Sequence, residues 1–320
     1  MLSAMQFLGN GKVRVVDQNE LEAAMHEHGL MWVNLETPSK DELAQLKKIF
    51  RLHPLTLENL VAFNQRPKTE EYSEYLFLIT HAINYESGKI KISEIDFVLG
   101  RNYLLSSSPS HIDAIVSLKE RISKEPAFFE KGSAFLLYSV IDAIVDSYFP
   151  IVDTISEEFD ALESEIFTNP NKKTLNKLFK LKRGLLQFRR TVNAQRETFN
   201  FLGRQESDLV PSEYRVYFRD VYDHLIRVSE SIDTYREVIS DSMDAYLSVI
   251  SNRLNEIMKV LTIIATIILP MSLVASFYGM NVDFPEYALL GKRETYFFAV
   301  GAMLLIIIIM LYWFRKNKWL

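Results

Sequence analysis

Two long segments without a charged side chain lie near the C-terminal end of the chain. The first covers residues 260–280 and the second covers residues 295–314. Each is about 20 residues long, and a helix of that length, at about 1.5 Å of rise per residue, crosses the ~30 Å hydrocarbon core of a bilayer. The sequence therefore predicts a membrane protein with two transmembrane helices, at about 260–280 and at 295–314.

The charges beside these segments predict their orientation. Three basic residues follow the second segment within residues 315–320, and Arg253 and Lys259 precede the first. The connecting residues 281–294 have a slight acidic excess. Because basic residues gather on the cytoplasmic side, we expect both termini in the cytoplasm, a basic cytoplasmic tail, and an extracellular loop across the plasma membrane. We also expect no signal peptide, since the first residues lack a basic and apolar leader.

Residues 1–130 predict a cytoplasmic α/β domain. Short runs rich in β-branched and aromatic residues predict strands, and an Asn-Gly pair after the first run predicts a tight hairpin turn. Pro38 with Ser39 is a typical helix start. The expected strands are residues 5–8, 12–16, 31–35, 75–85, 89–99 and 102–107, and the expected helices are residues 38–50, 53–60 and 111–124.

Residues 131–207 predict a cytoplasmic antiparallel helical hairpin. Its first arm covers residues 135–167, its second covers residues 172–202, and Asn169-Pro170-Asn171 separates them. The first arm is acidic in its second half, and the second arm is strongly basic. Complementary surfaces within the hairpin are the simplest explanation. An acidic face that gathers cations beside a pore is the functional alternative.

The interval between Pro211 and Pro270 contains no glycine and no proline. Apolar residues recur there at steps of three and four, which is the pattern of one amphipathic helix. About 58 residues at about 1.5 Å each give a rod of roughly 85 Å. The sequence therefore predicts a stalk helix over residues 208–280 that enters the membrane without a break. A plain coiled-coil stalk explains this pattern as well as a rod that transmits force.

One stripe of the predicted stalk helix is small or polar, even inside the apolar segment. Its residues are spaced by three and four, so they share one face. Close packing between helices explains such a stripe, the lining of a water-filled path explains it equally well, and the spacing leaves both open. The stripe consists of Asp241, Asp244, Ser248, Ser251, Asn255, Met258, Thr262, Ala265, Leu269, Ser272 and Ser276, with Leu261 beside it.

The composition argues against several function classes. The chain has no cysteine, which excludes disulfides, thiolate metal sites and cysteine nucleophiles. Its six histidines show no metal-ligand spacing on one helix face, and it has no Walker loop, so we expect neither an enzyme nor an organic cofactor. The net charge of −5 argues against nucleic acid as a partner.

The quartet Tyr278-Gly279-Met280-Asn281, at the outer end of the first uncharged segment, resembles the signature of the CorA-type magnesium transporters of the metal ion transporter superfamily. The resemblance covers nearly the whole chain. Further matching motifs are His53-Pro54-Leu55 with Glu58, Gln65-Arg66-Pro67-Lys68, Leu137-Tyr138-Ser139 with Ile141-Asp142-Ala143 and Asp146, Tyr217 to His224, Met258 to Thr262 with Pro270, and Lys318-Trp319-Leu320.

The resemblance implies an α+β soluble domain joined to a helical membrane protein. An N-terminal α/β/α domain would lead into a long stalk helix continuous with the first of two transmembrane helices, in a funnel-shaped homopentamer. The implied function is a channel for potential-driven influx of Mg²⁺, which also passes Co²⁺ or Ni²⁺ and is gated by intracellular Mg²⁺. The implied partners are further copies of the chain and the lipid bilayer. The implied pore-lining residues are Asn255, Met258, Leu261, Leu269, Ser272 and Ser276.

Gly279, Met280 and Asn281 correspond to the family's selectivity filter. Mg²⁺ dehydrates reluctantly, and a ring of Asn281 amide oxygens accepts hydrogen bonds from its water shell without stripping it. The plain alternative is a helix C-terminal cap with Gly279 and Asn281 in left-handed conformations. Beyond the filter the family's usual Met-Pro-Glu-Leu is only partly kept, yet Glu286 with Asp283 is expected to concentrate cations at the mouth.

The resemblance also implies regulatory carboxylates that Mg²⁺ bridges between neighbouring subunits. Asp220 and Asp244 match such positions, and Glu86 falls near the partner position. The plain alternative for each is a solvated surface acid. Two other functions also stay open: a membrane-anchored sensor or scaffold without ion flux, and a Zn²⁺ transporter of the same superfamily. Met280 favours Mg²⁺, since relatives that move other metals often replace it.

Overall fold

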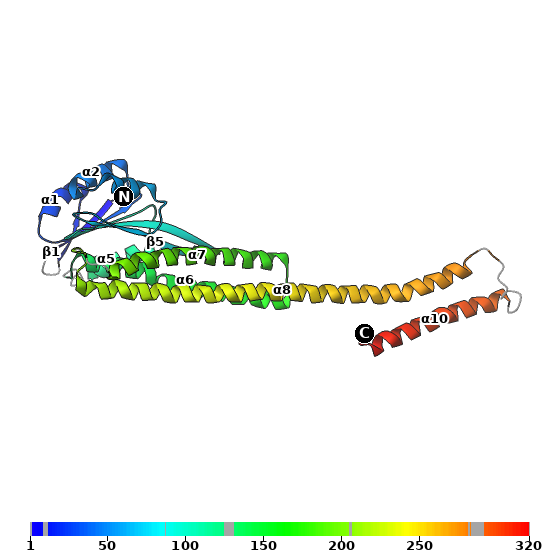
Figure 1. Ribbon diagram of the computed structural model, residues 1–320. Helices are drawn as coiled ribbons and strands as arrows, with labels where there is room; N and C mark the ends of the chain where they lie inside the picture. The colour runs from blue at the N-terminus through cyan, green and yellow to red at the C-terminus, as the bar shows by residue number, and fades with distance from the viewer. Residues whose placement is uncertain are drawn as a thin grey trace. The chain divides into compact units, whose positions relative to one another are not determined.

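The computed structural model describes residues 2–8, 12–86, 88–124, 131–204, 207–280, 282 and 291–319 (Figure 1). The chain divides into two compact units, Met1–Met243 and Asp244–Leu320. The long helix α8 (Arg215–Tyr278) contributes residues to both. Each unit is described by itself below.

The first unit is built on one seven-stranded mixed sheet with the strand order β2-β1-β3-β7-β6-β5-β4. β3 and β7 pair in parallel, with Met31 opposite Tyr103, and the other neighbours are antiparallel. The strands are β1 (Leu2–Leu8), β2 (Lys12–Val16), β3 (Leu30–Glu36), β4 (Lys68–Glu71), β5 (Leu76–Glu86), β6 (Lys89–Leu99) and β7 (Tyr103–Ser108).

Helices cover both faces of the sheet, so that nearly every side chain of the interior strand β3 is buried. On one face, Met31, Val33 and Leu35 pack in a core with residues of α1 (Leu21–His26), α2 (Lys40–Phe50) and α3 (Pro54–Ala62). On the other face lie α4 (Asp113–Lys124), α5 (Ser133–Asp146), α6 (Tyr148–Thr168) and α7 (Lys172–Arg204) (Figure 1). The predicted α/β/α layering is therefore confirmed.

The local sequence explains where these elements start. The Ser39 hydroxyl accepts a hydrogen bond from the Glu42 N–H at 3.2 Å, and the Glu42 carboxylate accepts one from the Ser39 N–H at 2.7 Å. This capping box begins α2 where the sequence predicts it. The six predicted strands and three predicted helices are all present, and the Asn-Gly turn itself lies outside the described residues. The short elements α1 and β4 are additions to the prediction.

The predicted first arm over residues 135–167 is helical but is interrupted once, at Ser147. Two helices occupy it, since α5 ends at Asp146 and α6 begins at Tyr148. Pro150 in the first turn of α6 explains the interruption, because it has no N–H with which to bond the carbonyl four residues earlier. Ser147 at the junction donates its N–H to the Ala143 carbonyl at 3.3 Å.

Charge pairing between α6 and α7 is much sparser than the sequence suggests. In the described part of the chain, one ion pair joins the two helices, between Lys177 and Glu165 at 3.9 Å. The basic helix α7 instead bonds to α8, where Arg189 contacts Asp233 at 2.7 Å. Complementary α6 and α7 surfaces therefore do not explain most of the charge on α7.

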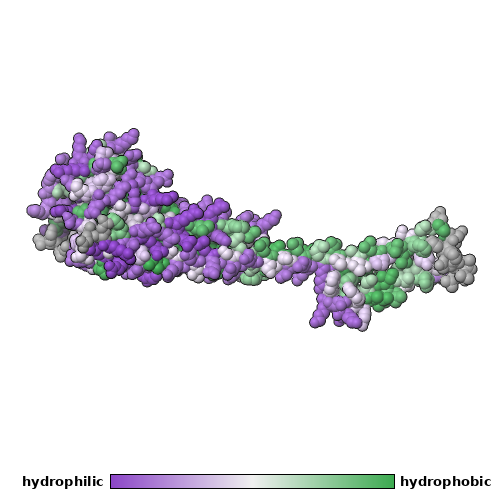
Figure 2. Space-filling model, in the orientation of Figure 1, coloured by the Kyte–Doolittle hydropathy of each residue, from purple (hydrophilic) through white to green (hydrophobic). Residues whose placement is uncertain are grey.

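Three helical stretches are long and apolar enough to cross a membrane: Ser133–Thr168, Ser212–Tyr278 and Arg293–Lys316. The most apolar window of the first is 56% buried inside the protein, against 6% and 11% in the other two. The first stretch therefore supplies the core of the soluble unit. The other two leave their apolar side chains uncovered (Figure 2).

The second unit contains the end of α8 and the helix α10 (Lys292–Lys316). Exposed aromatic residues mark both ends of α10, with Tyr296 and Phe297 near its start and Tyr312 and Trp313 near its end. Aromatic rings at these two levels are typical of the two membrane–water interfaces. The predicted long helix that continues into the first of two C-terminal apolar helices is confirmed.

Candidate functional site

The polar stripe lies on the uncovered side of α8. Ile263 is only 8% exposed, and Ile267 and Val274 are half-buried on the same side of the helix. At about 100° per residue, the stripe falls around the opposite side. The six positions expected to line a pore, Asn255, Met258, Leu261, Leu269, Ser272 and Ser276, are all exposed.

The hydroxyl and amide groups of the stripe differ in how they are bonded. The Thr262 hydroxyl donates to the Met258 carbonyl at 2.7 Å, so its polarity is satisfied within its own helix. Within the described residues, the side chains of Asn255, Ser272 and Ser276 have no hydrogen-bond partner. Unpaired polar groups at membrane depth are stable only against another protein surface or water. We therefore expect Ser272 and Ser276, which lie within the apolar segment, to face another protein surface or water.

Gly279 directly follows the end of α8 at Tyr278. Its conformation argues against a helix C-terminal cap in which this glycine is left-handed. Its N–H donates to the Ala275 carbonyl at 2.9 Å, and its φ is not among the positive values found in the described residues. The interpretation of Gly279 as a left-handed cap is therefore wrong. A Cβ at this position would lie 2.9 Å from the Ala275 oxygen, which requires the backbone to shift. Asn281, Asp283 and Glu286 lie outside the described residues.

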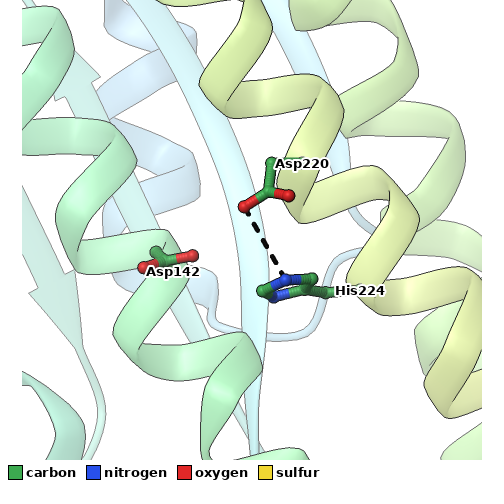
Figure 3. A group of neighbouring side chains, drawn as sticks. All are labelled: Asp142, Asp220 and His224. Carbon is green, nitrogen blue, oxygen red and sulfur yellow. Dashed lines mark ion pairs between the residues drawn. The ribbon is translucent and has the colours of Figure 1, made fainter.

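A cluster of acidic residues and one histidine joins α5 to α8 in the first unit (Figure 3). Asp142 of α5 and the pair Asp220 and His224 of α8 bring one ligand atom each within 4.8 Å of one another. His224 lies between two carboxylates: its Nδ1 is 3.2 Å from Oδ1 of Asp146, and its Nε2 is 3.7 Å from Oδ2 of Asp220. The spacing of four residues within each helix places each pair on one face.

The surroundings of Asp142 favour a bound cation. Burial, and then the nearby Asp146 carboxylate, raise the pKa of Asp142 to about 6, while His224 opposes the shift. Asp142 and Asp146 line a cavity of about 190 Å³, together with Tyr138, Tyr217 and the basic residues Arg121 and Lys131. A divalent cation here would relieve the repulsion between the carboxylates. Carboxylate oxygens suit Mg²⁺, and the imidazole also admits transition metals.

The three predicted regulatory carboxylates have different surroundings. Asp220 belongs to the cluster, whereas Asp244 is exposed on the part of α8 that belongs to the second unit. Glu86 is exposed and forms an ion pair with Lys91. Sequence reasoning did not single out Asp142 and His224 as candidate ligands. The available signal was the spacing of four residues in two motifs, Asp142 with Asp146 and Asp220 with His224.

Comparison with known proteins identifies the family. Residues 27–316 match the protein family described as CorA-like Mg2+ transporter protein. The chain belongs to this CorA family. It is 36% identical over 294 residues to the cobalt/magnesium transport protein CorA of Thermotoga maritima, a match that covers 90% of this chain and 83% of that protein. The CorA of Methanocaldococcus jannaschii, with the same description, is 28% identical over 96% of each chain.

A solved CorA structure shares the fold over the full length. The complete structure of the CorA magnesium transporter from Methanocaldococcus jannaschii superposes with a TM-score of 0.87 at 25% identity. The match covers 100% of this chain and 99% of that chain. The sheet domain, the long helix and the C-terminal helices therefore form the CorA architecture.

Proposed function

We propose that this chain forms a homopentameric channel that carries Mg²⁺ into the cytoplasm and also passes Co²⁺ or Ni²⁺. The observation that carries the proposal is the uncovered stripe of small and polar residues along α8, which continues to Gly279. The names of the relatives from Thermotoga maritima and Methanocaldococcus jannaschii, cobalt/magnesium transport proteins, support the choice of ions.

The chemistry of the stripe suits a hydrated dication. Copies of Asn255, Ser272 and Ser276 around a central path would present neutral oxygens, which accept hydrogen bonds from the water shell of Mg²⁺. Neutral groups hold a dication weakly enough for it to leave again. An inside-negative potential supplies about 4.6 kcal/mol per 100 mV for two charges, so influx needs no further energy source. In this arrangement Asn281, with Gly279 and Met280, acts as the selectivity filter, and Asp283 and Glu286 attract cations to the mouth.

The proposed topology has two spans, formed by the last part of α8 and by α10. The burial of the Ser133–Thr168 stretch argues against a third span. Both termini then face the cytoplasm of a cell whose plasma membrane contains the pentamer. The cytoplasmic part keeps the division into an α/β domain over residues 1–130, a helical region over residues 131–207, and the stalk from residue 208.

We further infer that intracellular Mg²⁺ binds the Asp142, Asp220 and His224 cluster and keeps the channel closed. The cluster joins α5 to α8, and α8 also bears the stripe. When the ion leaves, the carboxylates of Asp142, Asp146 and Asp220 repel one another, which loosens the start of α8 from α5. Asp244 and Glu86 remain proposed sites for a second bridging ion between subunits.

Ion uptake into proteoliposomes tests the proposed function. Vesicles loaded with a Mg²⁺ indicator and given an inside-negative potential should take up Mg²⁺ with the wild-type protein and much less with Asn281→Ala. Asn176→Ala provides the control, since Asn176 is an exposed asparagine of α7 and lies outside the stripe and the filter. Parallel runs with Zn²⁺ and Co²⁺ distinguish a Zn²⁺ transporter. Absence of flux from correctly assembled protein would favour a sensor or scaffold instead.

A further inference from the structure

The residues that follow α10 fold into a defined turn. The Trp319 N–H donates to the Phe314 carbonyl at 2.9 Å, and the Lys318 N–H donates to the Arg315 carbonyl at 3.2 Å. Together these two bonds form a Schellman motif, a common end of a helix. The Trp319 ring stacks on the Phe314 ring with 5.7 Å between the centroids, which is the apolar contact that often accompanies this motif. Residues 314–319 are therefore folded onto the end of α10.

Lys318 has an unusual backbone conformation for a lysine. Its φ is 58°, in the left-handed region, at the position of the motif that is usually glycine. Its carbonyl accepts a hydrogen bond from Nζ of Lys259 at 3.2 Å, which holds the turn against α8. Residues kept in an unfavourable backbone conformation are found most often at functional sites. The conformation of Lys318 therefore indicates that its cationic side chain has a use.

The turn presents three cationic side chains. Arg315, Lys316 and Lys318 are all exposed, and none of these side chains forms an ion pair or a hydrogen bond within the part of the chain that the structure describes. The sequence contains no acidic residue between positions 295 and 319. The three charges are therefore available to an anion from outside the chain.

An apolar and aromatic surface adjoins these charges. Tyr312, Trp313 and Trp319 are exposed, and the ring centroids of the two tryptophans lie 6.4 Å apart. The apolar stretch Arg293–Lys316 ends at the same place, and its surface is largely uncovered (Figure 2). Tryptophan and tyrosine at the end of a transmembrane helix lie at the level of the lipid headgroups. The three cations therefore lie at that level too.

We propose that Arg315, Lys316 and Lys318 bind the phosphate headgroup of an anionic phospholipid whose acyl chains lie along α10. An amphiphile with an anionic head matches both parts of this surface, whereas a soluble anion would contact the cations alone. Arginine can bond phosphate through two N–H groups, and basic residues beside a bilayer attract anionic lipid. The inference takes the cytoplasmic leaflet from the proposed topology and does not depend on ion conduction.

Quenching of tryptophan fluorescence by brominated lipids tests this proposal on the full-length protein in bilayers. Two of the three tryptophans, Trp313 and Trp319, lie at the site, and the third, Trp32, is buried in the sheet domain. The vesicles are phosphatidylcholine with a varied fraction of brominated phosphatidylglycerol or brominated phosphatidylcholine. The two quenching curves give the relative affinity of the site for the two headgroups. We expect a preference for phosphatidylglycerol of at least about fivefold, the effect of one basic residue near the membrane surface.

Charge-removing variants distinguish this site from a general effect of charge. The double variant Arg315→Gln with Lys316→Gln should bind the two lipids almost equally. Lys318→Gly should lower the preference severalfold although glycine suits the left-handed backbone, whereas Lys318→Arg should keep it. Arg293→Gln is the matched control, because Arg293 is an exposed arginine at the opposite end of α10. This variant should keep the wild-type preference.

Four results would overturn the proposal. The first is equal quenching by the two brominated lipids in wild-type protein. The second is a loss of preference in Arg293→Gln as large as in the double variant, and the third is a wild-type preference in Lys318→Gly. The fourth is inorganic phosphate that lowers the quenching more than chloride does at equal ionic strength, since the site would then bind free phosphate instead of a headgroup.

Discussion

The Nδ1 atom of His224 lies 3.2 Å from Oδ1 of Asp146, and this contact joins the early turns of α8 to the last turn of α5. Asp220 flanks the other side of the imidazole at 3.7 Å. The charges of this cluster therefore affect how the start of α8 is held. The stripe lies further along the same helix, from Asp241 onward. Under the proposed regulation, a cation that enters or leaves the cluster would change how firmly α8 is held.

Removing one carboxylate of the cluster should weaken its response to divalent cations. In wild-type protein we expect Mg²⁺ and Co²⁺ to raise the melting temperature, because they bind the folded cluster and not the unfolded chain. Asp142→Asn should raise the melting temperature without metal, since it relieves repulsion, and should shrink the metal-induced increase. Asp223→Asn, an exposed residue of α8 outside the cluster, is the control. A full metal response in Asp142→Asn would contradict the assignment.

The same cluster should respond to pH in a defined direction. The pKa of Asp142 is raised from 3.8 to about 6, mainly by burial. As the pH rises, the carboxyl group of Asp142 loses its proton at a lower pH in the unfolded chain than in the folded protein. Its ionisation therefore lowers the free energy of unfolding. This loss is complete above about pH 6 and absent below about pH 4. Protons also compete with the metal for the site. The Mg²⁺-induced rise in melting temperature should be smaller at pH 5 than at pH 7.5.

Asp142→Asn again supplies the comparison for the pH experiment. Because Asn does not titrate, the part of the pH dependence between about 4 and 6 that comes from this residue should disappear. An unchanged profile in the variant would show that another group titrates in that interval. Melting curves across this pH range, with and without Mg²⁺, decide between the two.

Gly279→Ala should abolish or strongly reduce Mg²⁺ uptake while the soluble unit stays folded. The added Cβ would lie 2.9 Å from the Ala275 oxygen, so the end of α8 must shift and carry the filter with it. Gly301→Ala is a matched control in α10, where a Cβ meets no described atom within 4 Å. There the substitution should be neutral or stabilise the helix by about 0.5–1 kcal/mol. Equal uptake in both variants would contradict the role of Gly279.

Much of the fold could be predicted because its signals are local. Strand alternation, the Ser39 cap and the unbroken spacing along α8 are properties of neighbouring residues. β4 escaped prediction because Lys68-Thr69-Glu70-Glu71 is charged, and pairing with β5 defines it. The break at Ser147 was visible in principle through Pro150, but the apolar spacing across it conceals it.

The site was less accessible to sequence reasoning, because it depends on packing between distant helices. The motif around Asp220 predicts a role for this residue. Its proximity to Asp142 depends on the packing of α5 against α8, which the sequence does not show. The charges of α6 and α7 misled for the same reason. Opposite signs suggested that many ion pairs join these two helices. In the described residues one does, between Lys177 and Glu165, while Arg189 bonds to Asp233 of α8.

The most direct test of the central claim, that the stripe of α8 lines an ion path, is cysteine accessibility. The wild-type chain has no cysteine, so single substitutions introduce the only thiol. Ser272→Cys and Ser276→Cys should react with a water-soluble cationic thiol reagent, and the reaction should block Mg²⁺ uptake in proteoliposomes. Ile263→Cys, on the covered side of the helix, should stay unmodified and active. Modification of Ile263→Cys but not of the two serine positions would contradict the account.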